Sequence, residues 1–158
     1  LDQVVDRDLI VTVMVGFAKA YFRKVTVFFV KASEMEEQLS EGPADFLAKV
    51  KGASFSLPHS NIFAAACQGG AHLFAPLPKD PANQAARALF DGDADAEVLV
   101  YPLVLHGKAK LVLAAAGKHE AFSHGVMRQV HMMVEKCAVA FQMLILRRRL
   151  YLVPPEMA

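Results

Sequence analysis

SHGVMRQVHMMVEKCAVAFQMLILRRRLY, residues 123–151, is the stretch of sequence that decides the fold. It contains no proline and no glycine after Gly125, so it predicts one long helix. Most of its residues as far as Leu146 are apolar, and polar residues recur at every seventh position: Arg128, Glu135, Gln142 and Arg149. A surface helix needs an apolar stripe only about 100° wide, so this helix must be covered on two sides. A sheet can cover one side; the other requires a neighbouring helix, a second subunit, or both.

The composition describes one globular domain. A chain of 158 residues with 54% apolar and 21% charged residues can bury a substantial core. We expect a single domain over 1–158, with its core at about 5–150 and a tail at 151–158. Because the chain begins at Leu1 rather than methionine, we also expect it to be a piece of a longer protein.

Charge and cysteine content limit the partners and the compartment. A net charge of +1 gives no attraction to nucleic acid or to anionic membranes, and we expect neither as a partner. Charged residues interrupt every apolar run before the roughly 18 residues of a membrane span. Cys67 and Cys137 are too far apart in sequence to indicate a disulfide framework or a metal site, which favours a reducing, cytoplasmic location.

The remaining sequence alternates helical and extended patterns. A first helix is expected from Asp6 or Asp8 to about Phe22, with a narrow polar stripe and otherwise apolar residues. A strand is expected next at 24–31, followed by a solvated acidic connection within 33–52 that includes a short helix at 43–51. The elements expected after it are a strand at 53–57, a helix at 60–68 capped by Ser60, an extended piece at 71–77 and a helix at 80–90.

The clearest local signal is a β-hairpin. EVLVYPLVL, residues 97–105, and KAKLVLAAA, residues 108–116, are joined by His106-Gly107, where glycine supplies a positive φ. Both strands are apolar on both faces, so we expect them in the middle of the sheet, with the following residues almost fully buried: Leu99, Tyr101, Leu103, Leu111 and Leu113. Pro102 indicates a bulge or a locally unpaired edge.

These elements predict an α+β fold. A central antiparallel sheet would carry the N- and C-terminal helices on one face, and the short helices of 60–90 would lie over the other. Nothing in the sequence indicates a phosphate loop, paired catalytic carboxylates or a nucleophile–base pair, so we expect no enzyme and no cofactor.

The chain resembles a GAF domain, the small-ligand and signalling module of many bacterial sensors. The resemblance covers about residues 5–150 and rests on SNIFAAACQGG, AHLFAPLP and VLVYPLVLHGKAKLVLAA, and on an ending, MLILRRRL, similar to an exit helix. A roadblock-type domain is the alternative fold. The sequence lacks the cyclic-nucleotide motif, a matched bilin cysteine and the clustered cysteines of GAF-like sulfoxide reductases, so no specific site is carried over.

The resemblance implies a ligand pocket between the sheet and residues 55–100. Four aromatic residues fall in the segments that would wall it: Phe55, Phe63, Phe74 and Tyr101. Apolar walls with few polar groups are usual for a small-molecule site. The alternative interpretation is that these rings only fill the core.

The leading hypothesis is a non-enzymatic regulatory domain that forms a homodimer through its terminal helices and works with other signalling domains. The residues expected in the interface are Met14, Phe17, Met133, Cys137 and Leu144. The alternatives are a ligand-free assembly domain and a redox sensor that uses the thiol of Cys67. A metal site at His119, Glu120 and His124 is weaker still, since nothing in the sequence fixes that loop.

Overall fold

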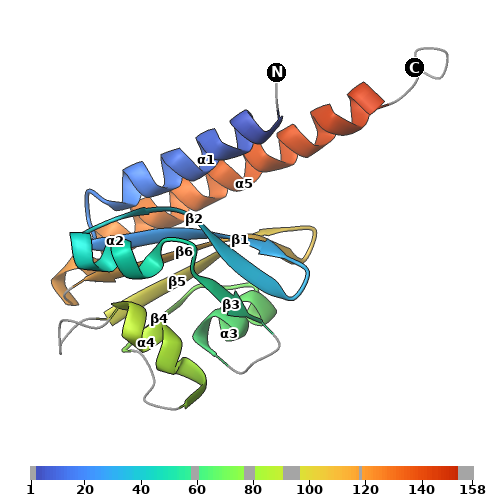
Figure 1. Cartoon of the computed structure of the whole chain (residues 1–158). Helices are drawn as coiled ribbons and strands as arrows, with labels where there is room; N and C mark the ends of the chain where they lie inside the picture. Colours follow the sequence, from blue (N-terminus) through green and yellow to red (C-terminus); the bar gives the residue numbers. More distant parts are fainter. Residues whose placement is uncertain (1–2, 58–60, 77–80, 91–96, 118, 153–158) are drawn as a thin grey trace.

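A six-stranded antiparallel sheet forms the centre of the molecule (Figure 1). The computed structural model describes residues 3–57, 61–76, 81–90, 97–117 and 119–152. The strand order is β3-β2-β1-β6-β5-β4, and the bounds are β1 Lys24–Lys31, β2 Glu34–Glu41, β3 Ser54–Ser56, β4 Leu73–Ala75, β5 Glu97–Leu105 and β6 Lys108–Gly117. The apolar β1 and β6 lie in the middle, as their sequences predict, whereas β5, also expected in the middle, has only the short edge strand β4 on its other side.

The helices cover both faces of this sheet. The long helices α1 (Gln3–Ala18) and α5 (His124–Leu152) lie side by side on one face, and α5 extends past the sheet (Figure 1). Three short helices lie on the other face: α2 (Ala44–Val50), α3 (Ile62–Gly69) and α4 (Gln84–Phe90). Short 3-10 turns, η1 (Pro81–Asn83) and η2 (His119–Phe122), precede α4 and α5. The predicted α+β architecture is therefore confirmed.

The β5–β6 hairpin divides the apolar residues into two cores. Leu99, Leu103, Leu111 and Leu113 are completely buried, and Tyr101 nearly so, on the face that α1 and α5 cover. The alternating set, Val98, Val100, Val112, Ala114 and Ala116, packs beneath the short helices. The predicted burial is confirmed, because side chains of successive strand residues point to opposite faces.

Two details of the hairpin follow from backbone chemistry. His106 and Gly107 both have positive φ, 53° and 77°, as a two-residue turn between twisted strands requires. Pro102 is paired with Val112, whereas β4 pairs only with Val98–Val100 on the other side of β5. Pro102 thus lies at a locally unpaired edge, next to a register shift at Leu103/Val104.

Three sequence-based boundaries were wrong. The expected acidic connection contains strand β2, whose Met35 is completely buried while Glu34 and Glu36 are exposed. Helix α1 begins at Gln3 and ends at Ala18, so Asp6 and Asp8 lie inside it instead of capping it. The side chain that caps α3 is that of Asn61, which accepts a 2.8 Å hydrogen bond from the Ala64 amide; Ser60 lies outside the described residues.

Helix α5 is the one helix among the described residues that is long and apolar enough to cross a membrane, by length and composition alone. One side of it is buried against the sheet and α1, through Val130, Met133, Val134, Cys137 and Phe141. Burial of this side explains part of the apolar composition of α5, although only 28% of its most apolar window is buried.

Candidate functional site

The outer face of α5 carries a stripe of exposed apolar side chains, the α5 stripe: Met132, Val139, Met143, Leu146 and Leu150. Met143 is 59% exposed and Leu150 is 73% exposed. With Lys136 included, the spacing alternates between four and three residues, which is the heptad pattern of a helix that packs against another helix. Side chains of this kind form a continuous seam, unlike single exposed apolar residues, which are common.

Helix α1 adds a second exposed apolar edge beside the stripe. Leu9 is 61% exposed and Val13 is 49% exposed. One turn further on, Gly16 is exposed, and a Cβ placed there would meet nothing within 4 Å. Between α1 and α5 lies a groove of about 450 Å³, lined by Leu9, Ile10, Val13, Phe17, Gln129, Met132, Met133, Lys136, Cys137 and Ala140. This surface is mostly apolar and open to a partner.

The structure changes the predicted set of interface residues. Met14 is completely buried inside the single chain and offers no exposed surface there, so its place in an interface stays a prediction. Met133 and Cys137 are also buried, at the floor of the groove, while Phe17 and Leu144 are half-buried at the edge of the same core. The apolar side chains with most free surface are instead those of the α5 stripe, on the side of the helix that faces away from the sheet, and Leu9 and Val13 of α1.

The four aromatic residues predicted to wall one pocket lie on opposite faces of the sheet. Phe55 and Phe63 pack together with a centroid distance of 4.8 Å, and each lies 5.6 Å from Phe28. Phe74 is paired with Leu99 and contacts Phe122, and Tyr101 belongs to the core beneath α1 and α5. The four rings therefore do not form one pocket, and on the short-helix face Phe55 and Phe63 pack against each other and against Phe28.

Tyr101 takes part in a chain of polar contacts that reaches the surface of α5. Its hydroxyl is hydrogen-bonded to Nδ1 of His131, whose Nε2 lies 3.0 Å from Oε1 of Glu135, and His72 stacks on its ring. A neutral His131 with its proton on Nε2 accepts from the tyrosine and donates to the glutamate. Burial, and then the charge of Glu135, raise the pKa of Tyr101. Sequence reasoning missed this group, because its members come from β5 and α5.

Replacing Tyr101 by phenylalanine is expected to weaken the pH dependence of stability above about pH 10. A tyrosine whose pKa is raised on folding stabilises the folded state below its unfolded pKa. That contribution is lost as pH rises through the folded pKa. Urea unfolding at about pH 8 and about pH 10.5 measures the loss for each protein. The wild type should lose more stability than Tyr101→Phe; equal losses would contradict this assignment.

The two cysteines have the surroundings of unreactive thiols. Cys67 is half-buried in α3 and Cys137 is buried in α5. Burial raises the pKa of each thiol, which disfavours the thiolate that redox chemistry requires. Among the residues that the structure describes, no group of three His, Cys, Asp or Glu side chains is placed to hold a metal ion.

Comparison with solved structures places this arrangement in a known fold. The GAF domain/HD domain protein from Geobacter sulfurreducens has a TM-score of 0.75 at 18% identity, over 89% of this chain and 95% of its own. The GAF-B domain of DevS from Mycobacterium smegmatis has a TM-score of 0.67 at 18% identity, over 94% and 99%. The GAF domain of a two-component sensor histidine kinase from Bacillus halodurans has a TM-score of 0.66 at 15% identity, over 89% and 96%.

The chain thus has a GAF-like fold. No family model matches the sequence, and the search of curated proteins finds no match. At these identities the likeness establishes the fold, and a fold alone does not define a ligand or an activity. The function must therefore be argued from the surfaces described above.

Proposed function

We propose that this domain is a non-enzymatic regulatory module that forms a homodimer through α1 and α5. The observation that carries the proposal is the α5 stripe, which with Lys136 follows the heptad pattern from Met132 to Leu150 and whose apolar side chains are 44–73% exposed. Each turn of such a stripe is stabilised when a second helix buries it, by about 25 cal/mol per Å² of apolar surface. The partner with a matching stripe is a second copy of the same chain.

The proposed dimer has its two α5 helices parallel about a two-fold axis. In that arrangement each stripe residue meets its own counterpart, so Met143 and Leu146 lie at the seam and the C-terminal ends of both helices lie together. Leu9 and Val13 of α1 border the seam, and Gly16 leaves room for a close helix. A change in the packing of either domain then alters the seam, and through it the paired ends of α5.

The module acts as a soluble cytoplasmic domain, with the buried side of α5 held by its own sheet.

A ligand-free assembly domain is the second candidate function. It is favoured by the cluster of Phe28, Phe55 and Phe63, which packs ring against ring on the face where the resemblance placed a ligand. Next to this cluster, Phe55 also lines a cavity of about 560 Å³ beside α2 and α4, together with Ser54 and Leu89. In the ligand-binding form of the module, a small ligand would bind in this cavity.

Native mass spectrometry of the purified protein tests the proposal and separates the two candidates. At low micromolar concentration the dominant species should have the mass of two chains. Additional mass that is lost on collisional activation would report a retained small molecule and favour the ligand-binding form. A single-chain mass across the concentration range would contradict the proposed dimer, whichever form is considered.

A further inference from the structure

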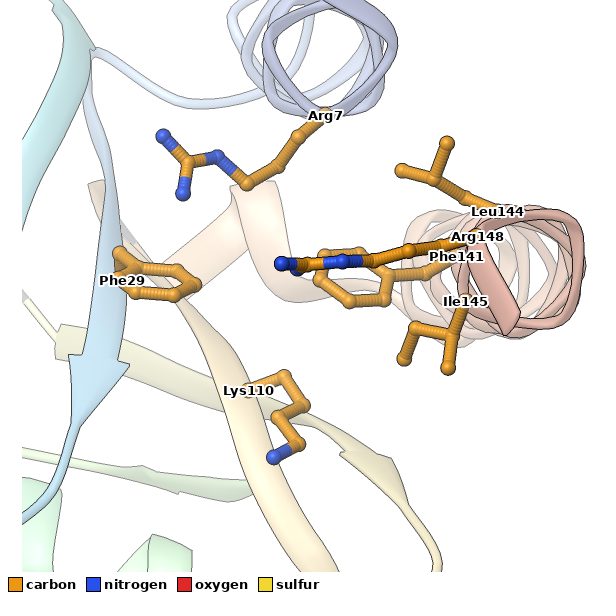
Figure 2. Close-up of a pocket in the computed structure, with 7 residues that line it drawn as sticks. All are labelled: Arg7, Phe29, Lys110, Phe141, Leu144, Ile145 and Arg148. Atoms are coloured by element: carbon orange, nitrogen blue, oxygen red, sulfur yellow. The ribbon is translucent and has the colours of Figure 1, made fainter. Parts of the chain in front are cut away.

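A separate pocket lies beneath the C-terminal half of α5, between the terminal helices and the sheet (Figure 2). Its volume is about 260 Å³. Its lining comes from four elements: Arg7 of α1, Phe29 of β1, Lys110 of β6, and Phe141, Leu144, Ile145 and Arg148 of α5. The lining therefore combines apolar side chains with three basic residues, and none of its described residues is acidic.

The two arginines approach the same space, and no carboxylate of the described residues lines it. In Figure 2, Arg148 reaches across the pocket beside Phe141, Arg7 lies above Phe29, and Lys110 lines the opposite wall. The Arg7 guanidinium lies 4.7 Å from the centre of the Phe29 ring. Like charges that converge in a partly apolar site repel one another, and a bound anion would remove this repulsion.

Arg7 also has an unused hydrogen-bond donor. Its Nε is buried and has no hydrogen-bond partner among the described residues. The nearest paired carboxylate, on the exposed Asp8, is 3.9 Å away, beyond hydrogen-bond distance. Within the described part of the chain, no carboxylate forms an ion pair with Lys110 or Arg148. A buried donor left unpaired is unfavourable, so the site favours a ligand that supplies an acceptor.

We propose that this pocket binds a small carboxylate with an apolar body. The carboxylate would accept charge-assisted hydrogen bonds from the arginines, whose planar guanidinium groups suit its two oxygens. The apolar body would lie against Phe29, Phe141 and Ile145. Inorganic phosphate would leave this wall uncovered. The volume lies just below the roughly 300–1,000 Å³ of sites for drug-sized molecules, so the ligand is small.

The pocket also lies on the opposite side of α5 from the α5 stripe. At about 100° per residue, Phe141 and Arg148 point nearly opposite to Val139 and Leu150. A ligand held between Arg7, Lys110 and Arg148 would therefore join α1, the sheet and α5 directly beneath the helical seam. An effect of the bound ligand on signalling rests on the proposed dimer, whereas binding of the ligand to the pocket does not.

Isothermal titration of the wild-type protein with octanoate tests this inference. We expect saturable binding of one octanoate per chain, in dimer or monomer, with octanol and inorganic phosphate binding at least about tenfold more weakly. Arg148→Gln and Arg7→Gln should each weaken octanoate binding by about tenfold or more, because each removes a charge-assisted hydrogen bond. Arg149→Gln is the matched control, since it removes the same charge from the neighbouring position outside the pocket. This variant should bind octanoate with the same affinity as the wild type.

Each contrary result overturns the inference. Absence of saturable octanoate binding removes the site, and equal binding of octanol shows that the cations do not recognise the ligand. Phosphate binding as tight as octanoate binding replaces the carboxylate with a phosphate ligand. An equal loss in Arg149→Gln shows a general charge effect. Arg7 and Arg148 lie on different helices, so each variant tests the site independently. If circular dichroism shows that one variant misfolds, octanoate binding by the other variant still tests the inference.

Discussion

Replacing Met143 by glutamate is expected to convert the proposed dimer into monomers while leaving the fold intact. Met143 is 59% exposed in the single chain, so its own domain does not depend on it. At a two-fold seam the substitution places two carboxylates against apolar side chains. If each costs at least about 2 kcal/mol, the dissociation constant rises by about a thousandfold. Native mass spectra should then show the single-chain mass at concentrations where the wild type shows two chains.

Two further variants make this result specific. Gln142→Glu adds the same charge at the neighbouring exposed position, outside the α5 stripe, and should remain dimeric. Met133→Glu places the charge in the core beneath the groove, where it should destabilise the fold itself. A Met143→Glu protein that stays dimeric, or one that unfolds as readily as Met133→Glu, would show that the stripe does not form the interface.

Truncation of Leu111 to alanine is expected to produce the largest loss of stability among simple core changes. Leu111 is completely buried on β6, between β1 and β5. Leucine-to-alanine changes in such sites cost about 2–5 kcal/mol, against the roughly 5–15 kcal/mol of stability that a domain has. Leu39→Ala, on the half-buried outer strand β2, is the matched control and should cost distinctly less. Denaturant unfolding measures both differences.

Amide exchange gives an independent check of the same core. The amides of β5 and β6 should be among the slowest to exchange, and those of β2 and β3 faster, because β3 is a short edge strand. If β6 exchanges as fast as β3, or Leu111→Ala costs no more than Leu39→Ala, then the hairpin is not the stable centre of the sheet.

The hairpin and the helical layers could be predicted because their sequences carry strong local signals. Two apolar runs around His106-Gly107 have one plausible pairing, and the register then determines which side chains are buried. Strand β2 could not be predicted in this way. Met35 and Leu39 are its apolar residues, and its glutamates are typical of a solvated loop. Its strand conformation comes from pairing with β1, a contact that local sequence does not encode.

The candidate site was only partly predictable for a related reason. The wide apolar surface of α5 predicts cover on two sides but not which side meets the sheet. Met133 and Met132 are therefore equivalent in the sequence, although one is buried and the other is exposed. The pairing of Phe74 with Leu99 placed two predicted pocket residues on the far face. The pocket beneath the C-terminal half of α5 draws Arg7 and Arg148 from opposite ends of the chain, so no sequence motif could indicate it.

Oxidative cross-linking tests the central claim, that α5 pairs in parallel with α5 of a second copy along the α5 stripe. In a protein carrying Cys67→Ser and Cys137→Ala, a disulfide forms only when two Cα atoms lie within about 7 Å. Met143→Cys and Leu146→Cys should each give rapid, nearly complete two-chain products, whereas Gln142→Cys should give little. Equal cross-linking at all three positions, or none at Met143→Cys and Leu146→Cys, would contradict the parallel α5 seam.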